Sequence, residues 1–189
     1  MTWSATISNW QNVSSVTGDA TTGTMWHRML SRCGDGLFLY ARQLCGNNTD
    51  AADVVQEAFL RVWRKHARNG VTELDLPALC YAAVRYVVLD RQRQLARRRR
   101  REVAAGECLY DQPALFQSSL EQTEDHAKLE AAILALPAEQ REVVTLKTWG
   151  ELTFQEIAAV TGESVNTVAS RYRLALAALR KQFAKTGAP

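Results

Sequence analysis

Apolar side chains recur at three- and four-residue steps in three segments of the N-terminal half. The first segment runs from Thr24 to Gly46. The second is expected to start at Asp50, where Asp or Thr can cap the free backbone N–H groups. Asp75 and Pro77 are start signals for the third, which passes through Asp90 into a group of arginines. The apolar face of the first segment consists of Met25, Met29, Cys33, Leu37, Tyr40 and Leu44. That of the second consists of Val55, Ala58, Phe59, Val62 and Trp63. Three helices that share one core are predicted.

A second group of helices is predicted in the C-terminal part. Residues 125–136 are helical by pattern, and Pro137 opens a helix with apolar positions Val143, Val144 and Leu146. Thr153 and Glu156 have the spacing of a capping box before a short helix over residues 154–160. Residues 161–163 form a turn, and Ser164 caps the last helix. The expected buried face of that helix is Val165, Val168, Tyr172, Leu176, Leu179 and Phe183.

The pattern contains no strand and no internal repeat, so the predicted fold class is all-α with two small helical domains. These are a three-helix N-terminal bundle and a four-helix C-terminal domain that contains a helix-turn-helix. The helix-turn-helix follows from spacing: Ala158 is small where two helices cross, Gly162 accepts an unusual turn, and Val168 enters the core. A helical hairpin within a bundle is the alternative.

Charge divides the chain more sharply than its net value of +3 suggests. Between Arg85 and Arg101 there are eight arginines, and Asp90 is the only acid, whereas residues 102–125 contain six acids and no Lys or Arg. We expect a polar, flexible leader over 1–23, a first domain over 24–101, an acidic linker over 102–124 and a second domain over 125–184. Arginine neutralises phosphates, so the basic run favours nucleic-acid contact over a solvated helix end.

The sequence gives little indication of metal binding, disulfide formation or catalysis. Cys33, Cys45, Cys80 and Cys108 are widely spaced and lack zinc-ligand spacing, and His27, His66 and His126 are scattered. We therefore expect reduced thiols, no metal, no cofactor and no catalytic centre. The chain opens without an apolar signal sequence, and its longest apolar run, residues 78–89, is interrupted by Arg85. A cytoplasmic protein without a membrane span is expected.

In their order along the chain, these segments resemble the extracytoplasmic-function (ECF) sigma factors, two-domain bacterial proteins that direct RNA polymerase to promoters. Residues 50–63 resemble the helix that binds the clamp of core polymerase, with Asp53, Gln56 and Glu57 at the contacting positions. Tyr81, Arg85 and the arginines that follow are similar to the helix that engages the melted minus-ten element. The loop over 67–75 corresponds to the segment that captures a flipped base. The implied minus-ten residues are Arg85, Tyr86, Arg91, Arg93, Arg97 and Arg98.

In the second domain, residues 136–143 and 153–158 resemble the reader of the minus-thirty-five element, and residues 164–171 resemble its recognition helix. The implied contacts to promoter DNA are Ser164, Asn166, Thr167, Ser170, Arg171 and Arg173. Tyr86 stands where many members have Asn, and Ala169 stands where a basic residue is frequent, and both departures bear on promoter preference. The resemblance makes an anti-sigma factor a further candidate partner, and it places the acidic linker in a basic channel of the polymerase.

Two other functional classes compete with this interpretation. A stand-alone repressor or activator would use the same helix-turn-helix, normally as a dimer, but no further helix remains for dimerisation. An enzyme acting on nucleic acid would need clustered carboxylates, a metal site or a nucleophile with its base, and no such group is visible.

Overall fold

The structure is a computed structural model that describes residues 20–66, 75–104, 129 and 131–186. The chain divides into two compact units, Met1–Gln117 and Ser118–Pro189. Three predicted segments, the polar leader, the base-capturing loop and the acidic linker, fall mainly on residues outside the described ranges.

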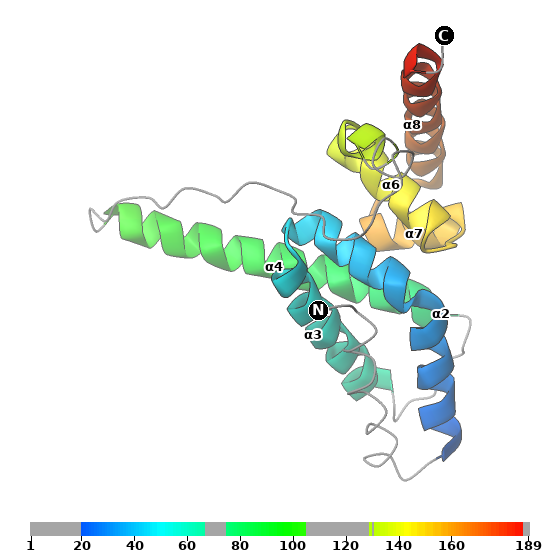
Figure 1. Ribbon diagram of the computed structural model, residues 1–189. Helices are drawn as coiled ribbons and strands as arrows, with labels where there is room; N and C mark the ends of the chain where they lie inside the picture. Colours follow the sequence, from blue (N-terminus) through cyan, green and yellow to red (C-terminus); the bar gives the residue numbers. More distant parts are fainter. Residues whose placement is uncertain (1–19, 67–74, 105–128, 130, 187–189) are drawn as a thin grey trace. The chain divides into compact units, whose positions relative to one another are not determined.

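Three helices form the described part of unit 1: α2 (Ala20–Cys45), α3 (Asn48–His66) and α4 (Leu76–Ala104) (Figure 1). The predicted order and type of these elements are confirmed, although α2 begins at Ala20 rather than at Thr24. Gly46 follows α2 with φ of 83°, a left-handed conformation that ends a helix without the steric cost that a Cβ would bring.

The start of α3 differs in its capping residue from the prediction. Asn47, not Asp50, is the cap: its Oδ1 accepts a hydrogen bond from the backbone N–H of Asp50 at 2.8 Å. The Asn47 amide also donates to the Asp50 carboxylate at 2.7 Å. Asp50 instead lies in the first turn, where a carboxylate is favoured by the positive end of the helix dipole.

The core of unit 1 lies where its three helices pack against one another. Trp26 contacts Phe59 edge-on with ring centroids 5.1 Å apart, and Tyr40 contacts Tyr81 at 5.6 Å. The largest fully buried side chains of this core are Leu37, Tyr40, Val54, Leu76, Tyr81, Val84 and Val87. Burying each such side chain stabilises the fold by roughly 1.5–3 kcal/mol, so this core holds α4 firmly along its N-terminal half.

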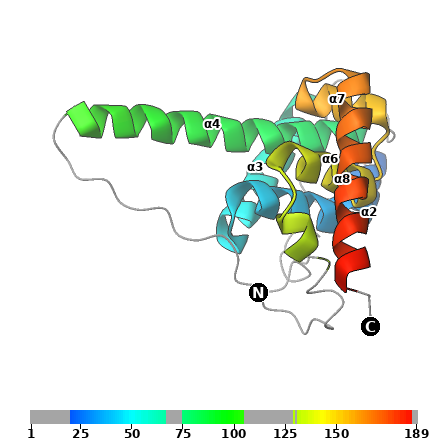
Figure 2. The same cartoon turned by 90° about the horizontal axis from the view of Figure 1, so that it is seen from above.

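The C-terminal half of α4 continues beyond α2 and α3 and carries the arginine run (Figures 1 and 2). Residues 92–98 are exposed. This extension is made mostly of Arg, Gln, Leu and Ala, which have high helix propensity. Asp90 accepts a hydrogen bond from Gln94 one turn later at 3.0 Å, which adds local support.

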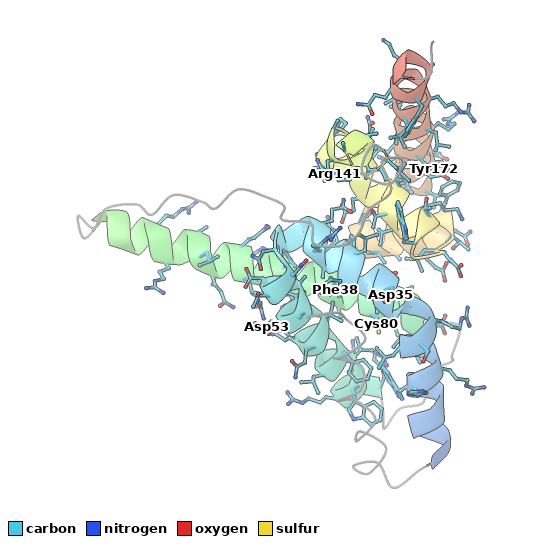
Figure 3. The ribbon with its side chains drawn as sticks, viewed as in Figure 1. Asp35, Phe38, Asp53, Cys80, Arg141 and Tyr172 are labelled. Carbon is cyan, nitrogen blue, oxygen red and sulfur yellow. The ribbon has the colours of Figure 1, made fainter. Side chains whose placement is uncertain are left out.

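Unit 2 contains α6 (Ala138–Thr148), α7 (Phe154–Thr161) and α8 (Val165–Thr186), preceded by helical residues 131–134 (Figure 2). Its core includes the predicted Val143, Val144 and Leu146, together with Ile157 and Val168. Arg141 on α6 donates to the carbonyl oxygens of Leu134 and Leu136, at 2.8 and 3.0 Å. These bonds tie the preceding segment to α6, on which Arg141 is labelled in Figure 3.

The predicted buried face of α8 is partly wrong. Val168 is fully buried, but Val165 and Phe183 are 42% and 41% exposed. The face is centred on Ala175, which packs with Leu136 and Val144 and has Tyr172, Ala178 and Leu179 beside it. Val168 and Ala175 are two helical turns apart and define the contact line. Val165 and Phe183 are rotated away from that line, so their apolar side chains stay accessible.

Candidate nucleic-acid interface

The helix-turn-helix of unit 2 begins with the predicted capping box. Thr153 Oγ1 accepts a hydrogen bond from the backbone N–H of Glu156 at 3.2 Å. The Glu156 carboxylate in turn accepts one from the backbone N–H of Thr153 at 2.7 Å. Two N–H groups that α7 would leave without helical partners are thus satisfied, which fixes where this short helix starts.

The turn between α7 and α8 has the geometry predicted for it. Gly162 adopts φ 76° and ψ 21°, and its N–H donates to the carbonyl of Ala158 at 2.9 Å. Glu163 donates to the same carbonyl at 3.2 Å. Ala158 is buried, as expected of a small residue where helices cross. The left-handed Gly162 and the two hydrogen bonds to the Ala158 carbonyl determine the direction in which α8 leaves α7.

At the N-terminus of α8, the predicted DNA contact Ser164 also serves as the cap. Ser164 Oγ accepts from the backbone N–H of Thr167 at 3.1 Å, and the two hydroxyl groups lie 2.8 Å apart. Ser164 is exposed and Thr167 is half-buried. Each hydroxyl keeps further hydrogen-bonding capacity, so capping and DNA contact are compatible.

Asn166, Ser170 and Arg173 follow one another at four- and three-residue steps on the side of α8 opposite to Val168 and Ala175. The Arg173 guanidinium donates to Ser170 Oγ at 3.2 Å. A row of an amide, a hydroxyl and a guanidinium offers donors and acceptors to base edges and phosphates.

Arg171 lies at the edge of this row. It forms an ion pair with Glu163, 3.2 Å between the charged atoms, and its side chain is 27% exposed. Leu174, which is 59% exposed, borders the polar row on the same surface. Tyr172 faces the interior instead, with its ring 5.6 Å from that of Phe154 (Figure 3).

The polar face of α3 contains the residues predicted to contact polymerase. Asp53 (Figure 3) and Gln56 are exposed, whereas Glu57 is half-buried and engaged. One Glu57 carboxylate oxygen lies 2.6 Å from Arg61, and the other lies 2.9 Å from Arg91 on α4. The hydrogen bond from Arg91 is the largest of the effects that lower the pKa of Glu57 below its ordinary value of 4.5; burial opposes it and Arg61 adds to it.

Arg61 is not among the site residues predicted from the sequence. Besides its pair with Glu57, its guanidinium lies 4.0 Å from Asp90 and 5.3 Å from the centre of the Tyr86 ring. The i, i+4 spacing of Glu57 and Arg61 was a visible signal for the first contact. The contacts with α4 had no signal, because they depend on how two helices pack.

The predicted minus-ten residues all lie on α4. Tyr86 is 55% exposed, Arg85 and Arg91 are half-buried, and Arg93, Arg97 and Arg98 are exposed on the extension. This arrangement places an accessible aromatic ring on the same helix as a series of guanidinium groups. Such a surface suits a nucleic-acid strand whose bases stack while its phosphates are neutralised.

Metal and thiol chemistry has little support in the described residues. In these ranges no group of three or more His, Cys, Asp and Glu side chains could hold a metal ion. Cys33, Cys45 and Cys80 form no disulfide, and burial raises the pKa of the Cys80 thiol to about 12. Among the helices so described, none has the length and apolarity needed to cross a membrane.

Comparisons with known proteins agree with this geometry. The Sigma-70 region 2 family matches residues 29–99, and the Sigma-70 region 4 family matches residues 126–179. The chain is 33% identical over 149 residues to the RNA polymerase sigma-E factor of Streptomyces avermitilis, covering 79% of each protein. It is 30% identical over 175 residues to the ECF RNA polymerase sigma factor SigE of Mycolicibacterium smegmatis, covering 89% of this chain and 65% of that protein.

Solved structures share the fold. The sigma factor RpoE, in its complex with the anti-sigma factor NepR from Bartonella quintana, matches with a TM-score of 0.59 at 21% identity. That match covers 84% of this chain and 96% of RpoE. The two family matches and the sequence relatives decide the identity. The chain belongs to the ECF subfamily of sigma-70 RNA polymerase sigma factors, which are not enzymes, and it directs promoter recognition in transcription initiation.

Proposed function

We propose that unit 1 docks on core RNA polymerase through α3 and engages the melted minus-ten element through α4, while α8 of unit 2 reads the minus-thirty-five duplex. The observation that carries this proposal is the coincidence of each sigma-region match with a suitable surface. Region 2 matches the unit that contains the polar face of α3 and the arginine run of α4. Region 4 matches the unit that contains the helix-turn-helix. Polymerase binding places this activity in the bacterial cytoplasm.

The three residues proposed to contact polymerase differ in how exposed they are, and therefore in how directly they can reach a partner. Asp53 and Gln56 are exposed and can approach a partner directly. Glu57 has 36% of its side chain exposed and already has two arginine partners, so it contributes charge at the edge of the contact. A basic surface on the clamp of the polymerase is the matching partner chemistry.

For the minus-ten element, Tyr86 provides a stacking surface for an unpaired base, a contact worth roughly 1–3 kcal/mol per base. Arg85, Arg91, Arg93, Arg97 and Arg98 neutralise phosphates of the same strand, which releases counterions and makes binding depend on salt. The continuous α4 keeps the ring and the guanidinium groups in fixed register.

For the minus-thirty-five element, the polar row of Asn166, Ser170 and Arg173 faces the bases. Ser164 and Thr167 contact the backbone at the helix N-terminus, where N–H groups and the helix dipole favour a phosphate. Arg171 reaches DNA when its ion pair with Glu163 opens. The capping box and the Gly162 turn hold α8 in the angle that this requires.

An anti-sigma protein is proposed as a further partner. The sigma factor RpoE, which shares this fold, was solved in complex with the anti-sigma factor NepR. A protein that binds the polymerase-contacting and DNA-contacting surfaces of this chain would hold it inactive.

The test uses the full chain, core polymerase free of sigma factors, and promoters selected from a randomised library by the reconstituted holoenzyme. Gln56→Ala should weaken co-elution with core polymerase, whereas Gln155→Ala, which alters an exposed glutamine on α7, should not. Arg173→Ala should weaken binding to the upstream duplex, with the exposed Arg180→Ala on the same helix as control. Failure of the unmodified chain to co-elute with core polymerase would refute the proposal.

A further inference from the structure

The Glu57 carboxylate joins two surfaces that the proposed function keeps separate. It belongs to the α3 face that contacts polymerase, yet one of its oxygens accepts a hydrogen bond from Arg91 on α4 at 2.9 Å. Arg91 belongs to the group of arginines that contact the minus-ten element. The same carboxylate therefore serves a polymerase contact and neutralises a DNA contact.

The other oxygen of Glu57 is held by Arg61 at 2.6 Å, and Arg61 lies over the Tyr86 ring and near Asp90. The Arg61 contact keeps the carboxylate directed towards α4. Glu57 thus has an arginine on each oxygen, and Asp90 supplies a second negative charge beside Arg61. A third cation brought by the polymerase would compete with both.

From this geometry we infer that Glu57 couples polymerase docking to promoter binding. In the free chain its carboxylate neutralises Arg91 and weakens the affinity of α4 for phosphates. When a basic group of the polymerase binds Glu57, Arg91 loses its counter-charge and becomes available to the minus-ten strand. This inference rests on the proposed function, because it uses the polymerase contact of α3 and the DNA contact of α4.

The expected size of the coupling follows from the solvent exposure of the two side chains. The Glu57 and Arg91 side chains are 36% and 39% exposed, so solvent screens their attraction. Ion pairs of this kind contribute little free energy, so removing one partner should change the affinity for DNA about two- to fivefold. Because coupling between two ligands is reciprocal, bound promoter DNA should strengthen polymerase binding by the same factor.

The direct test measures the affinity of the free chain for a fluorescein-labelled single strand of mixed sequence, about 12 nucleotides long. Glu57→Gln should tighten binding about two- to fivefold. Asp35→Asn removes the same charge from an exposed position on α2 and serves as the matched control for net charge (Figure 3). Glu57→Ala gives a second variant without the carboxylate. Equal tightening by Asp35→Asn, or weaker binding by both Glu57 variants, would overturn the inference.

A double-variant cycle assigns the gain to Arg91. In an Arg91→Gln background, Glu57→Gln should change affinity no more than Asp35→Asn does, because no guanidinium remains at position 91 to be released. A gain that persists in this background would show that another group causes it and would also overturn the inference.

Co-elution with core polymerase separates this inference from the proposed function. Glu57→Gln should lower co-elution while it raises DNA affinity, two effects of opposite sign that a general structural defect would not produce. Lower co-elution with unchanged DNA affinity would leave the proposed function in place and overturn the coupling. Unchanged co-elution would remove Glu57 from the polymerase contact and overturn both that assignment and the coupling.

Discussion

The turn residue Gly162 gives a sharp test of the helix-turn-helix geometry. Its φ of 76° lies in the left-handed region, and a Cβ built at this position would meet no atom within 4 Å. A substitution here therefore creates backbone strain without a steric clash. Gly162→Ala isolates that strain, and Gly162→Asn tests it with a residue that tolerates the conformation better.

The expected magnitude is the difference of two terms. Forcing an L-residue into the left-handed region costs roughly 1–2 kcal/mol. Replacing Gly by Ala also restricts the unfolded chain, which offsets about 0.4–1 kcal/mol of that cost. Gly162→Ala should therefore lower the free energy of unfolding of unit 2 by about 1 kcal/mol, and Gly162→Asn by less.

Hydrogen exchange followed by mass spectrometry of the full chain measures this locally. Amides of α7 and α8 that open with unit 2 should exchange about fivefold faster in Gly162→Ala, while the core amides of α3 should be unchanged. The strain argument would be refuted if Gly162→Ala exchanged like the unmodified chain. It would also fail if Asn proved as destabilising as Ala.

Four further outcomes are expected. Thr153→Ala removes the capping box of α7 and should lower the stability of unit 2 by about 1 kcal/mol in urea denaturation; an unchanged midpoint would contradict the role of the cap. Arg173→Ala should weaken upstream duplex binding by roughly 1–3 kcal/mol and relax one base preference if Arg173 contacts a base, whereas a uniform loss with a smaller salt slope would indicate a phosphate contact. Because Arg91 lowers the pKa of Glu57 below 4.5, its carboxylate stabilises unit 1 above about pH 4.5, and this stability is lost as pH falls through the folded pKa. The stability difference between the unmodified chain and Glu57→Gln is expected to be under about 1 kcal/mol, because solvent screens this partly exposed pair. It should therefore shrink in acid denaturation, and a constant difference would count against the ion pair. Burial raises the pKa of Cys80 to about 12, so iodoacetamide at pH 8 should label Cys80 only as unit 1 unfolds, as peptide mapping would show, and fast labelling of the native chain would disprove its burial.

The cap of α3 shows where local sequence information became ambiguous. Asn47 and Asp50 both have side-chain oxygens that can accept from a helix N-terminus, and both are suitable caps by residue type. The backbone path after Gly46 determines that Asn47 holds the non-helical position and Asp50 the first turn. One misplaced cap moved the predicted helix start by only two residues, from Asn48 to Asp50, because the apolar stripe of α3 fixed the rest.

The sequence by itself determined the features whose partners lie within one or two helical turns. The Thr153–Glu156 box, the left-handed Gly162, the Ser164 cap and the apolar stripe of α3 all depend on neighbours three or four residues away. Their spacing was sufficient to identify the helix-turn-helix and the polar face of α8. The order of these motifs then indicated the ECF family.

Tertiary structure decided what depends on the packing of distant segments. The buried line of α8 follows Ala175 rather than Leu176, because the small side chain allows close contact with Leu136 and Val144. The Glu57–Arg91 contact joins residues 34 positions apart, and it exists only because α3 and α4 pack side by side. A hydrophobic pattern indicates which face of a helix is buried. Which polar atoms then meet across two helices depends on their exact rotation and separation, and these are set by the core as a whole.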